Sequence, residues 1–181
     1  MAFEATGDTA LDLYLDPAGQ LLHKLAVIPT GNAPKQVAFT PDGAELWVTL
    51  LAGAGFEVYD PTTGALLAGV ELPDAGSVEV IFNSAGTLAY VSQMETASVY
   101  EVDVASREVV RRMSTGGVWT KVMVLSPDET RLYASNWVSD DVSEIDLAGV
   151  AHVLGFFNQF RKFLCRWPDV FQVDVVAVFV L

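Results

Sequence analysis

Few of the 181 residues have the side chains that disulfides and metal centres require. Cysteine occurs once, at Cys165, so no intramolecular disulfide can stabilise the fold. The two histidines, His23 and His152, have no second ligand-type residue at zinc-site spacing. There is no serine nucleophile elbow and no glycine-rich phosphate loop between a strand and a helix. We therefore expect no metal, no cofactor and no local catalytic motif, and we expect His23 to lie on an outer strand.

Basic residues are also scarce. The chain has 10 Lys and Arg against 23 Asp and Glu, which gives a net charge of −13. Nucleic acid binding requires clustered positive charge, so this composition argues against it, and equally against binding to anionic membrane surfaces. The expected partner is a protein or a small molecule, which the residues do not identify.

Long apolar runs are absent, although 51% of the residues are hydrophobic. A membrane-spanning helix needs roughly 18 or more consecutive apolar residues, so we expect no membrane span. The short apolar runs are broken by Asp, Gly, Pro and Thr, which is typical of many short strands. The first residues, 1–4, have neither a basic start nor an apolar segment, so no secretion signal is expected in this chain.

A 43-residue repeat organises most of the sequence. Asp60, Asp103 and Asp146 follow one another at this spacing, each after a strand-like run. The same period relates three further sets of positions: Trp47, Tyr90 and Tyr133; Phe39, Phe82 and Leu125; and Asp42, Ala85 and Asp128. Towards the N-terminus, Phe3 precedes Trp47 by 44 residues, and Asp16 precedes Asp60 by 44 residues. One unit contains strand-like segments at 35–40, 45–50, 55–60 and 65–72. Four short antiparallel strands in about 40–50 residues indicate a β-propeller blade, with the recurring aromatic packed between blades.

The repeated aspartates occupy turns. Asp42 lies in a Pro-Asp-Gly turn, and Asp60 begins the turn 60–64. An aspartate in such a place hydrogen-bonds the backbone two residues on, so we interpret these residues as turn formers rather than calcium ligands. The segment Ser139–Asp141 is the best isolated acidic cluster, but it offers too few oxygens for a hard cation and is expected to be a solvated loop.

Turn and strand motifs carry a family resemblance. The turns between the first and second strands read Thr40-Pro41-Asp42-Gly43 and Ser126-Pro127-Asp128-Glu129. The second strands of the units read Trp47-Val48-Thr49-Leu50, Tyr90-Val91-Ser92-Gln93 and Tyr133-Ala134-Ser135-Asn136. The link between two units reads Gly31-Asn32-Ala33-Pro34. Residues 1–150 thus resemble the YVTN family of β-propeller repeats. Similar propellers include surface-layer proteins, lactonase-like enzymes and electron-transfer domains, mostly with seven blades. The resemblance implies an extracytoplasmic location, periplasmic or at the surface.

The predicted fold is all-β: a partial β-propeller of four-stranded antiparallel blades. Residues 34–75 and 76–117 form complete blades, residues 1–33 supply the last three strands of one blade, and residues 118–150 the first three of another. Residues 151–181 form a hydrophobic tail outside the repeat, which replaces the missing outer strand, or is a membrane or partner segment, or is a frame-shifted end. Open blade edges favour self-association.

Candidate binding residues come from the links and loops that line the channel mouth in other propellers. Trp119 and Trp137 break the repeat, and polar residues lie near them. The candidates are Lys35, Trp119, Lys121, Asn136, Trp137 and Asp140, and ordinary loop packing is the competing interpretation. The first functional hypothesis is a non-enzymatic ligand- or protein-binding module, a fragment of a larger propeller. The alternative is a fragment of a lactonase-like enzyme or redox domain whose catalytic residues lie on missing blades.

Overall fold

The computed structural model describes residues 27–148 with their side chains, and the backbone of short strands within 5–23 and at 154–156. Every regular element in these residues is a β-strand. The part of the chain described here contains no helix with the length and apolarity to cross a lipid bilayer.

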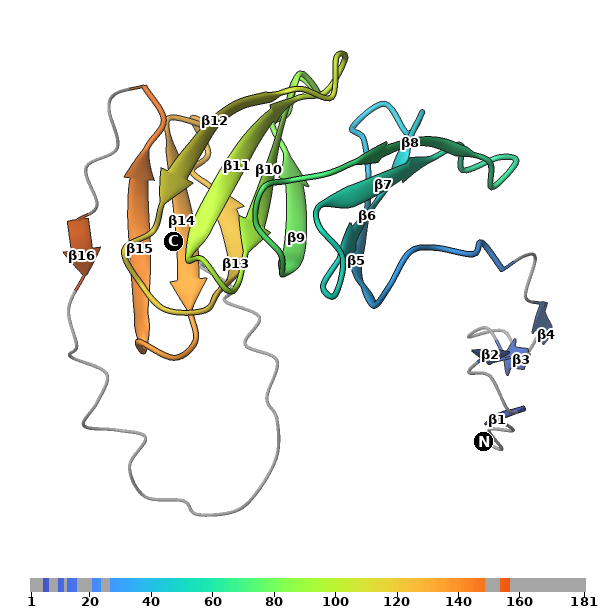
Figure 1. Ribbon diagram of the computed structural model, residues 1–181. Helices are drawn as coiled ribbons and strands as arrows, with labels where there is room; N and C mark the ends of the chain where they lie inside the picture. Colours follow the sequence, from blue (N-terminus) through green and yellow to red (C-terminus); the bar gives the residue numbers. More distant parts are fainter. Residues whose placement is uncertain are drawn as a thin grey trace.

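Three four-stranded antiparallel sheets follow one another along the chain (Figure 1). In each sheet the strands pair in chain order, so each is a simple meander. The first sheet contains β5 (Pro34–Phe39), β6 (Leu46–Leu50), β7 (Phe56–Tyr59) and β8 (Leu66–Val70); the second contains β9 (Ser77–Phe82), β10 (Leu88–Gln93), β11 (Ser98–Asp103) and β12 (Val109–Ser114); the third contains β13 (Thr120–Leu125), β14 (Arg131–Asn136), β15 (Asp141–Asp146) and β16 (Leu154–Phe156). This is the architecture of a partial β-propeller, as the repeat predicts.

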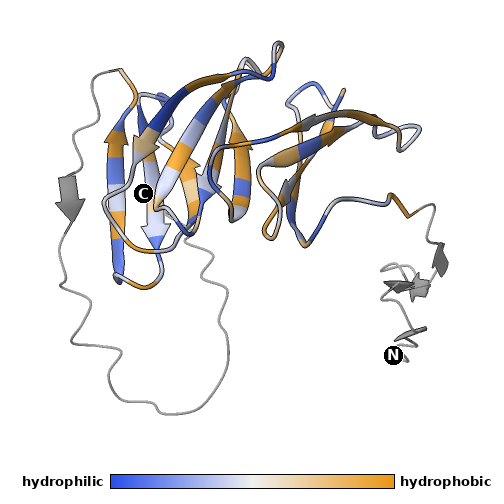
Figure 2. Cartoon of the chain, viewed as in Figure 1, coloured by the Kyte–Doolittle hydropathy of each residue, from blue (hydrophilic) through white to orange (hydrophobic). Residues whose placement is uncertain are grey.

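The first strands of the three sheets, β5, β9 and β13, lie side by side and are called the inner strands below (Figure 1). Apolar and polar residues alternate along many of the strands (Figure 2). In β14, for example, Leu132, Ala134 and Asn136 are buried, whereas the residues between them are partly exposed. Period-two burial of this kind follows from the pleat, because successive side chains point to opposite faces of a sheet.

The recurring aromatic position packs between sheets, as predicted. Trp47 is fully buried and stacks on Phe56 of its own sheet, with ring centroids 4.5 Å apart. It also meets the ring of Phe82 from the second sheet edge-on at 5.2 Å. Tyr90 takes the equivalent place between the second and third sheets, in a core that includes Met123. Phe3, at the same repeat position, lies outside the described residues.

A side chain from each of two inner strands also crosses to the next sheet. Gln36 Oε1 accepts a hydrogen bond from the backbone N–H of Val80 at 2.7 Å. Glu79, 43 residues later, accepts one from the backbone N–H of Met123. The repeat therefore preserves a polar contact between sheets as well as the strands themselves.

A second polar contact comes from the neighbouring strand of each sheet. The Thr49 hydroxyl donates to the carbonyl oxygen of Val78 at 2.9 Å. The Ser92 hydroxyl donates to the carbonyl oxygen of Lys121 at 2.7 Å. These hydroxyls give inner-strand carbonyl groups a hydrogen-bond partner at the sheet–sheet boundary.

The turn aspartates have the local role that the sequence predicts. Asp60 accepts the backbone N–H of Thr62 at 2.7 Å, and Asp103 accepts that of Ser106 at 2.8 Å. These hydrogen bonds hold the pKa of both carboxyl groups below the usual range. Asp146 accepts the N–H of Ala148 in the same way. Asp16 lies outside the described residues.

The third sheet has one strand more than the three expected from residues 118–150. Strand β16 (Leu154–Phe156) pairs with β15 at Val142, Ser143 and Glu144. It comes from the segment predicted to be a non-repeat tail. Backbone pairing needs no particular side chains, which is why the lost repeat pattern did not reveal this strand. Residues 157–181, with Cys165, lie outside the described part of the chain, as does His152.

Four short strands precede the first sheet. Strand β1 (Ala5–Thr6) pairs with β2 (Ala10–Leu11), and β3 (Leu13–Leu15) pairs with β4 (Leu21–His23). The two pairs are separate two-stranded sheets. His23 belongs to the last of these strands.

Candidate functional site

Five of the six predicted binding residues lie at one end of the third sheet, and three of them, Trp119, Lys121 and Trp137, come together there. Trp119 directly precedes β13, and Trp137 directly follows β14. The two segments are joined by a backbone hydrogen bond of 3.0 Å from Trp137 N–H to the Trp119 carbonyl oxygen. Trp119 has a φ of +61°, in the left-handed region that bulky residues rarely occupy. Such a conformation persists where surrounding contacts hold it, and these are often at functional sites.

Trp119, Lys121 and Trp137 form what is called the tryptophan–lysine cluster below. The ring centroids of the two tryptophans are 6.0 Å apart, at an interplanar angle of 58°. Lys121 Nζ lies 3.2 Å from the centroid of the Trp137 ring, within cation–π distance. Trp119 is 41% exposed and Trp137 is 59% exposed, so both residues are partly accessible to a ligand.

Lys35 belongs to the same neighbourhood. It lies at the start of β5, as Lys121 does at the start of β13, and the inner strands lie side by side. Burial lowers the pKa of Lys121, and the positive charge of Lys35 lowers it further. The structure thus brings two cations to one end of the inner strands, in a protein whose net charge is −13.

Asn136 lies beneath this cluster rather than on its surface. Its side chain is 2% exposed. The amide group donates to Asp141 and Ser143, each at 2.7 Å, and the amide oxygen accepts from the Thr120 hydroxyl at 2.6 Å. The residue therefore connects β13, β14 and β15 at the end that carries the cluster, and its polar atoms are not free for a ligand.

Asp140 is exposed in the turn between β14 and β15, with a φ of +56°. No contact joins its side chain to the tryptophan–lysine cluster within residues 27–148. The described residues also hold no group of three His, Cys, Asp or Glu side chains that could bind a metal ion.

Glu79 is a titratable group that the sequence did not single out. Burial between the inner strands raises the pKa of its carboxyl group to about 7, and the hydrogen bond from the Met123 N–H opposes that rise. The sequence did contain a signal for this residue: Glu79 is acidic, whereas the same repeat position in the other units is occupied by Gln36 and Val122.

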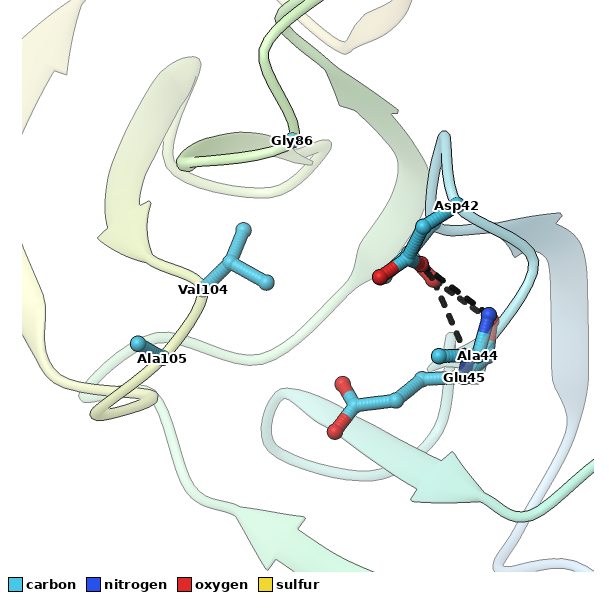
Figure 3. Close-up of a pocket in the computed structure, with 7 residues that line it drawn as sticks. Asp42, Ala44, Glu45, Gly86, Val104 and Ala105 are labelled. Carbon is cyan, nitrogen blue, oxygen red and sulfur yellow. Dashed lines mark hydrogen bonds between the residues drawn. The ribbon is translucent and has the colours of Figure 1, made fainter.

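A shallow hollow of about 150 Å³ lies between the first two sheets, at the opposite end of the strands (Figure 3). Asp42 and Glu45 line it. The Asp42 carboxylate accepts hydrogen bonds from Thr40 at 2.6 Å and from the Ala44 N–H at 3.0 Å, and Glu45 is paired with Arg107. Because its acidic groups already have partners within the fold, this hollow is a weaker candidate than the tryptophan–lysine cluster.

No family model matches the chain, but a curated protein is similar to it in sequence. Antigen Lp49 of Leptospira interrogans is 30% identical over 139 residues, which is 74% of this chain and 30% of that protein. The chain thus spans less than a third of the length of this relative.

Solved structures of low sequence identity share the fold. A Bacteroides uniformis protein provisionally described as a 6-phosphogluconolactonase matches with a TM-score of 0.62 and 18% identity, covering 79% of this chain and 49% of that one. The WD40 repeats of RRP9 match with a TM-score of 0.64 and 12% identity, covering 74% and 41%. Hydrazine synthase of Kuenenia stuttgartiensis matches with a TM-score of 0.60 and 21% identity, covering 67% and 35%. The chain therefore has the fold of a β-propeller and spans between about a third and a half of these solved chains.

Proposed function

We propose that this chain is a non-enzymatic binding module, part of a larger YVTN-type propeller, which binds an anionic ligand with a flat apolar portion at the tryptophan–lysine cluster. The observation that carries the proposal is the placement of Lys121 Nζ 3.2 Å from the Trp137 ring centroid, beside a second exposed indole. A cation held against an aromatic face, at an accessible end of a rigid sheet, suits recognition of a charged group next to an apolar one.

The charge distribution supports an anion. Lys35 and Lys121 repel each other at one end of the inner strands, which contributes to the lowered pKa of Lys121. A carboxylate or phosphate placed between the two ammonium groups would relieve this repulsion. Since the chain as a whole carries a charge of −13, long-range attraction would favour cations, so selectivity for an anion has to come from these local contacts.

The family assignment is part of the proposal. It is supported by the Thr40–Gly43 and Ser126–Glu129 turns and by the three Trp- or Tyr-initiated second strands. Further blades would come from sequence beyond this chain, because the chain covers less than half of each solved propeller compared here.

The test is titration with benzoate, with benzyl alcohol as the uncharged analogue, followed by calorimetry. We expect benzoate to bind and benzyl alcohol to bind at least about tenfold more weakly, since a charge-assisted contact contributes about 1.5–3 kcal/mol. Lys121→Gln and Trp137→Ala should each weaken benzoate binding by a similar factor.

Arg112→Gln is the matched control, because Arg112 lies over the Tyr100 ring at 5.9 Å on the second sheet and is also a cation on an aromatic face. It should leave benzoate binding unchanged. Equal affinity of the wild type and Lys121→Gln for benzoate would contradict the proposal.

A lactonase-like enzyme is the second candidate, and Glu79 is the observation that favours it. A carboxyl group with a pKa of about 7 suits general acid–base catalysis, although one of its oxygens is engaged by Met123. Hydrolysis of 6-phosphogluconolactone above the buffer rate by the chain, lost in Glu79→Gln, would favour this candidate over a binding module. A rate equal to that of buffer would contradict it for this chain.

A further inference from the structure

The residue directly before each inner strand has a left-handed backbone conformation. Ala33, Gly76 and Trp119 lie 43 residues apart and precede β5, β9 and β13. Their φ values are +54°, +89° and +61°. Three equivalent residues thus share a conformation that only glycine adopts without strain.

The same position makes the same backbone contact in every unit. Its carbonyl oxygen accepts a hydrogen bond from the backbone N–H that directly follows the second strand of the sheet. The donors are Leu51 at 2.9 Å, Met94 at 2.9 Å and Trp137 at 3.0 Å. Because the conformation and the contact recur together, we infer that the sheet architecture requires a positive φ here, whichever side chain the residue carries.

A tryptophan is costly at this position. A left-handed φ brings the Cβ atom of any L-residue close to its own backbone. Space is also short at Gly76, where an added Cβ would lie 3.1 Å from the side chain and 3.3 Å from the backbone nitrogen of Glu95. The other two units carry small residues, Ala33 and Gly76, at this point. The fold therefore gives no reason for Trp119, and a residue that opposes the local backbone preference is often retained for function.

The fold does account for Trp137. Its repeat equivalents are Leu51 and Met94, so a large apolar side chain is ordinary at that position. Lys121 Nζ lies over the Trp137 ring and covers one of its faces. Within residues 27–148 no cation lies over the ring of Trp119. Trp137 therefore holds the cation, and Trp119 is the indole left for a flat group to stack on.

We propose that Trp119 makes the tryptophan–lysine cluster select planar aromatic anions over aliphatic ones, a role that rests on the function proposed above. The anionic group of the ligand contacts Lys121, and its ring stacks on the Trp119 indole. Trp137 positions Lys121 and therefore supports the binding of either kind of anion. The strain at Trp119 is then a stability cost of ligand selectivity.

The test compares benzoate with cyclohexanecarboxylate by calorimetry. The two anions have the same charge and a similar size, but the second has a puckered ring. We expect Trp119→Gly to reduce the preference for benzoate about two- to tenfold, the range that aromatic pairs contribute beyond their buried area. Trp137→Ala is the matched control: it should weaken the binding of both anions by a similar factor and leave the preference unchanged.

Urea unfolding tests the strain separately from binding. Trp119→Gly should unfold at a higher urea concentration than Trp119→Ala, because both variants lack the indole and only glycine relieves the left-handed φ. Trp137→Gly and Trp137→Ala form the control pair. Trp137 does not have a positive φ, so there the glycine variant should be the less stable of the two.

The outcomes separate this proposal from the proposed function. If benzoate binds and Lys121→Gln weakens it, but Trp119→Gly keeps the full preference for benzoate, the selectivity role of Trp119 is overturned and the binding module stands. If benzoate does not bind to the wild type, both are overturned. A Trp119→Gly variant no more stable than Trp119→Ala would overturn the strain argument. If Trp119→Gly does not fold, as judged by circular dichroism, Trp119→Ala serves for the binding comparison.

Discussion

The Glu79 carboxylate accepts the backbone N–H of Met123 from the neighbouring sheet. In the preceding unit Gln36 makes the same bond to Val80 with a neutral amide. A glutamine and a glutamate thus occupy equivalent inter-sheet positions, and they differ mainly in charge. The charged member has to be desolvated between the inner strands, which raises the pKa of Glu79 to about 7.

Glu79→Gln should stabilise the fold at neutral and alkaline pH. The folded-state pKa of about 7 lies above the ordinary value of 4.5, so the folded state binds the proton more tightly than the unfolded chain. Wild-type stability should therefore fall as pH rises from about 4.5 to about 7 and stay low above that range. The variant removes this loss, and we expect a gain of about 1–2 kcal/mol at pH 8 and little at pH 4.

Urea unfolding at both pH values measures this difference. Glu108→Gln is the control, because Glu108 is exposed in the turn before β12, and it should follow the wild-type profile. A pH dependence of stability that is the same in the wild type and in Glu79→Gln would contradict the prediction.

Asn136→Ala should lower the free energy of unfolding by about 2–3 kcal/mol, because it removes three hydrogen bonds from a largely buried network that includes Thr120 and Ser143. Thermal unfolding followed by circular dichroism measures the loss. Asn32→Ala, at an exposed position, should change stability by less than about 0.5 kcal/mol. Two variants of equal stability would show that the Asn136 network contributes nothing.

Gly55→Ala should be far more damaging than Gly43→Ala, although both glycines have positive φ values, of +99° and +72°. A Cβ at position 55 would lie 2.0 Å from the Val70 carbonyl oxygen, whereas at position 43 no atom lies within 4 Å. We expect Gly43→Ala to cost about 1–2 kcal/mol through backbone strain alone. Gly55→Ala should lower the free energy of unfolding by more than this, because the β7–β8 pairing has to shift to make room for the Cβ. Denaturant unfolding of both variants measures the difference, and equal unfolding midpoints would contradict the prediction.

The sequence predicts most of the fold because its strongest signals are local. A turn aspartate such as Asp60 acts on the backbone two residues on, so its role follows from its immediate neighbours. The burial of Asn136 was also within reach, because it follows Leu132 and Ala134 at a spacing of two and shares their buried face. Its place beside a predicted loop suggested an exposed residue instead.

Other features depend on tertiary placement. The bond from the Met123 N–H to Glu79 joins residues 44 positions apart, and nothing in either segment alone indicates it. Strand β16 is paired by backbone groups after the repeat pattern has ended, so no side-chain signal marks it. The cation–π contact of Lys121 with Trp137 likewise requires the two ends of β13 and β14 to meet.

The convergence of Lys35 and Lys121 at one end of the inner strands gives the proposed site its preference for an anion, and an NMR titration of the Lys121 side chain tests this convergence most directly. We expect Lys121 to titrate below the ordinary value of 10.5, because of its burial and of the nearby Lys35 charge, and its pKa to rise in Lys35→Gln. A Lys121 pKa at the ordinary value that does not respond to Lys35→Gln would contradict the convergence, and with it the proposed anion site.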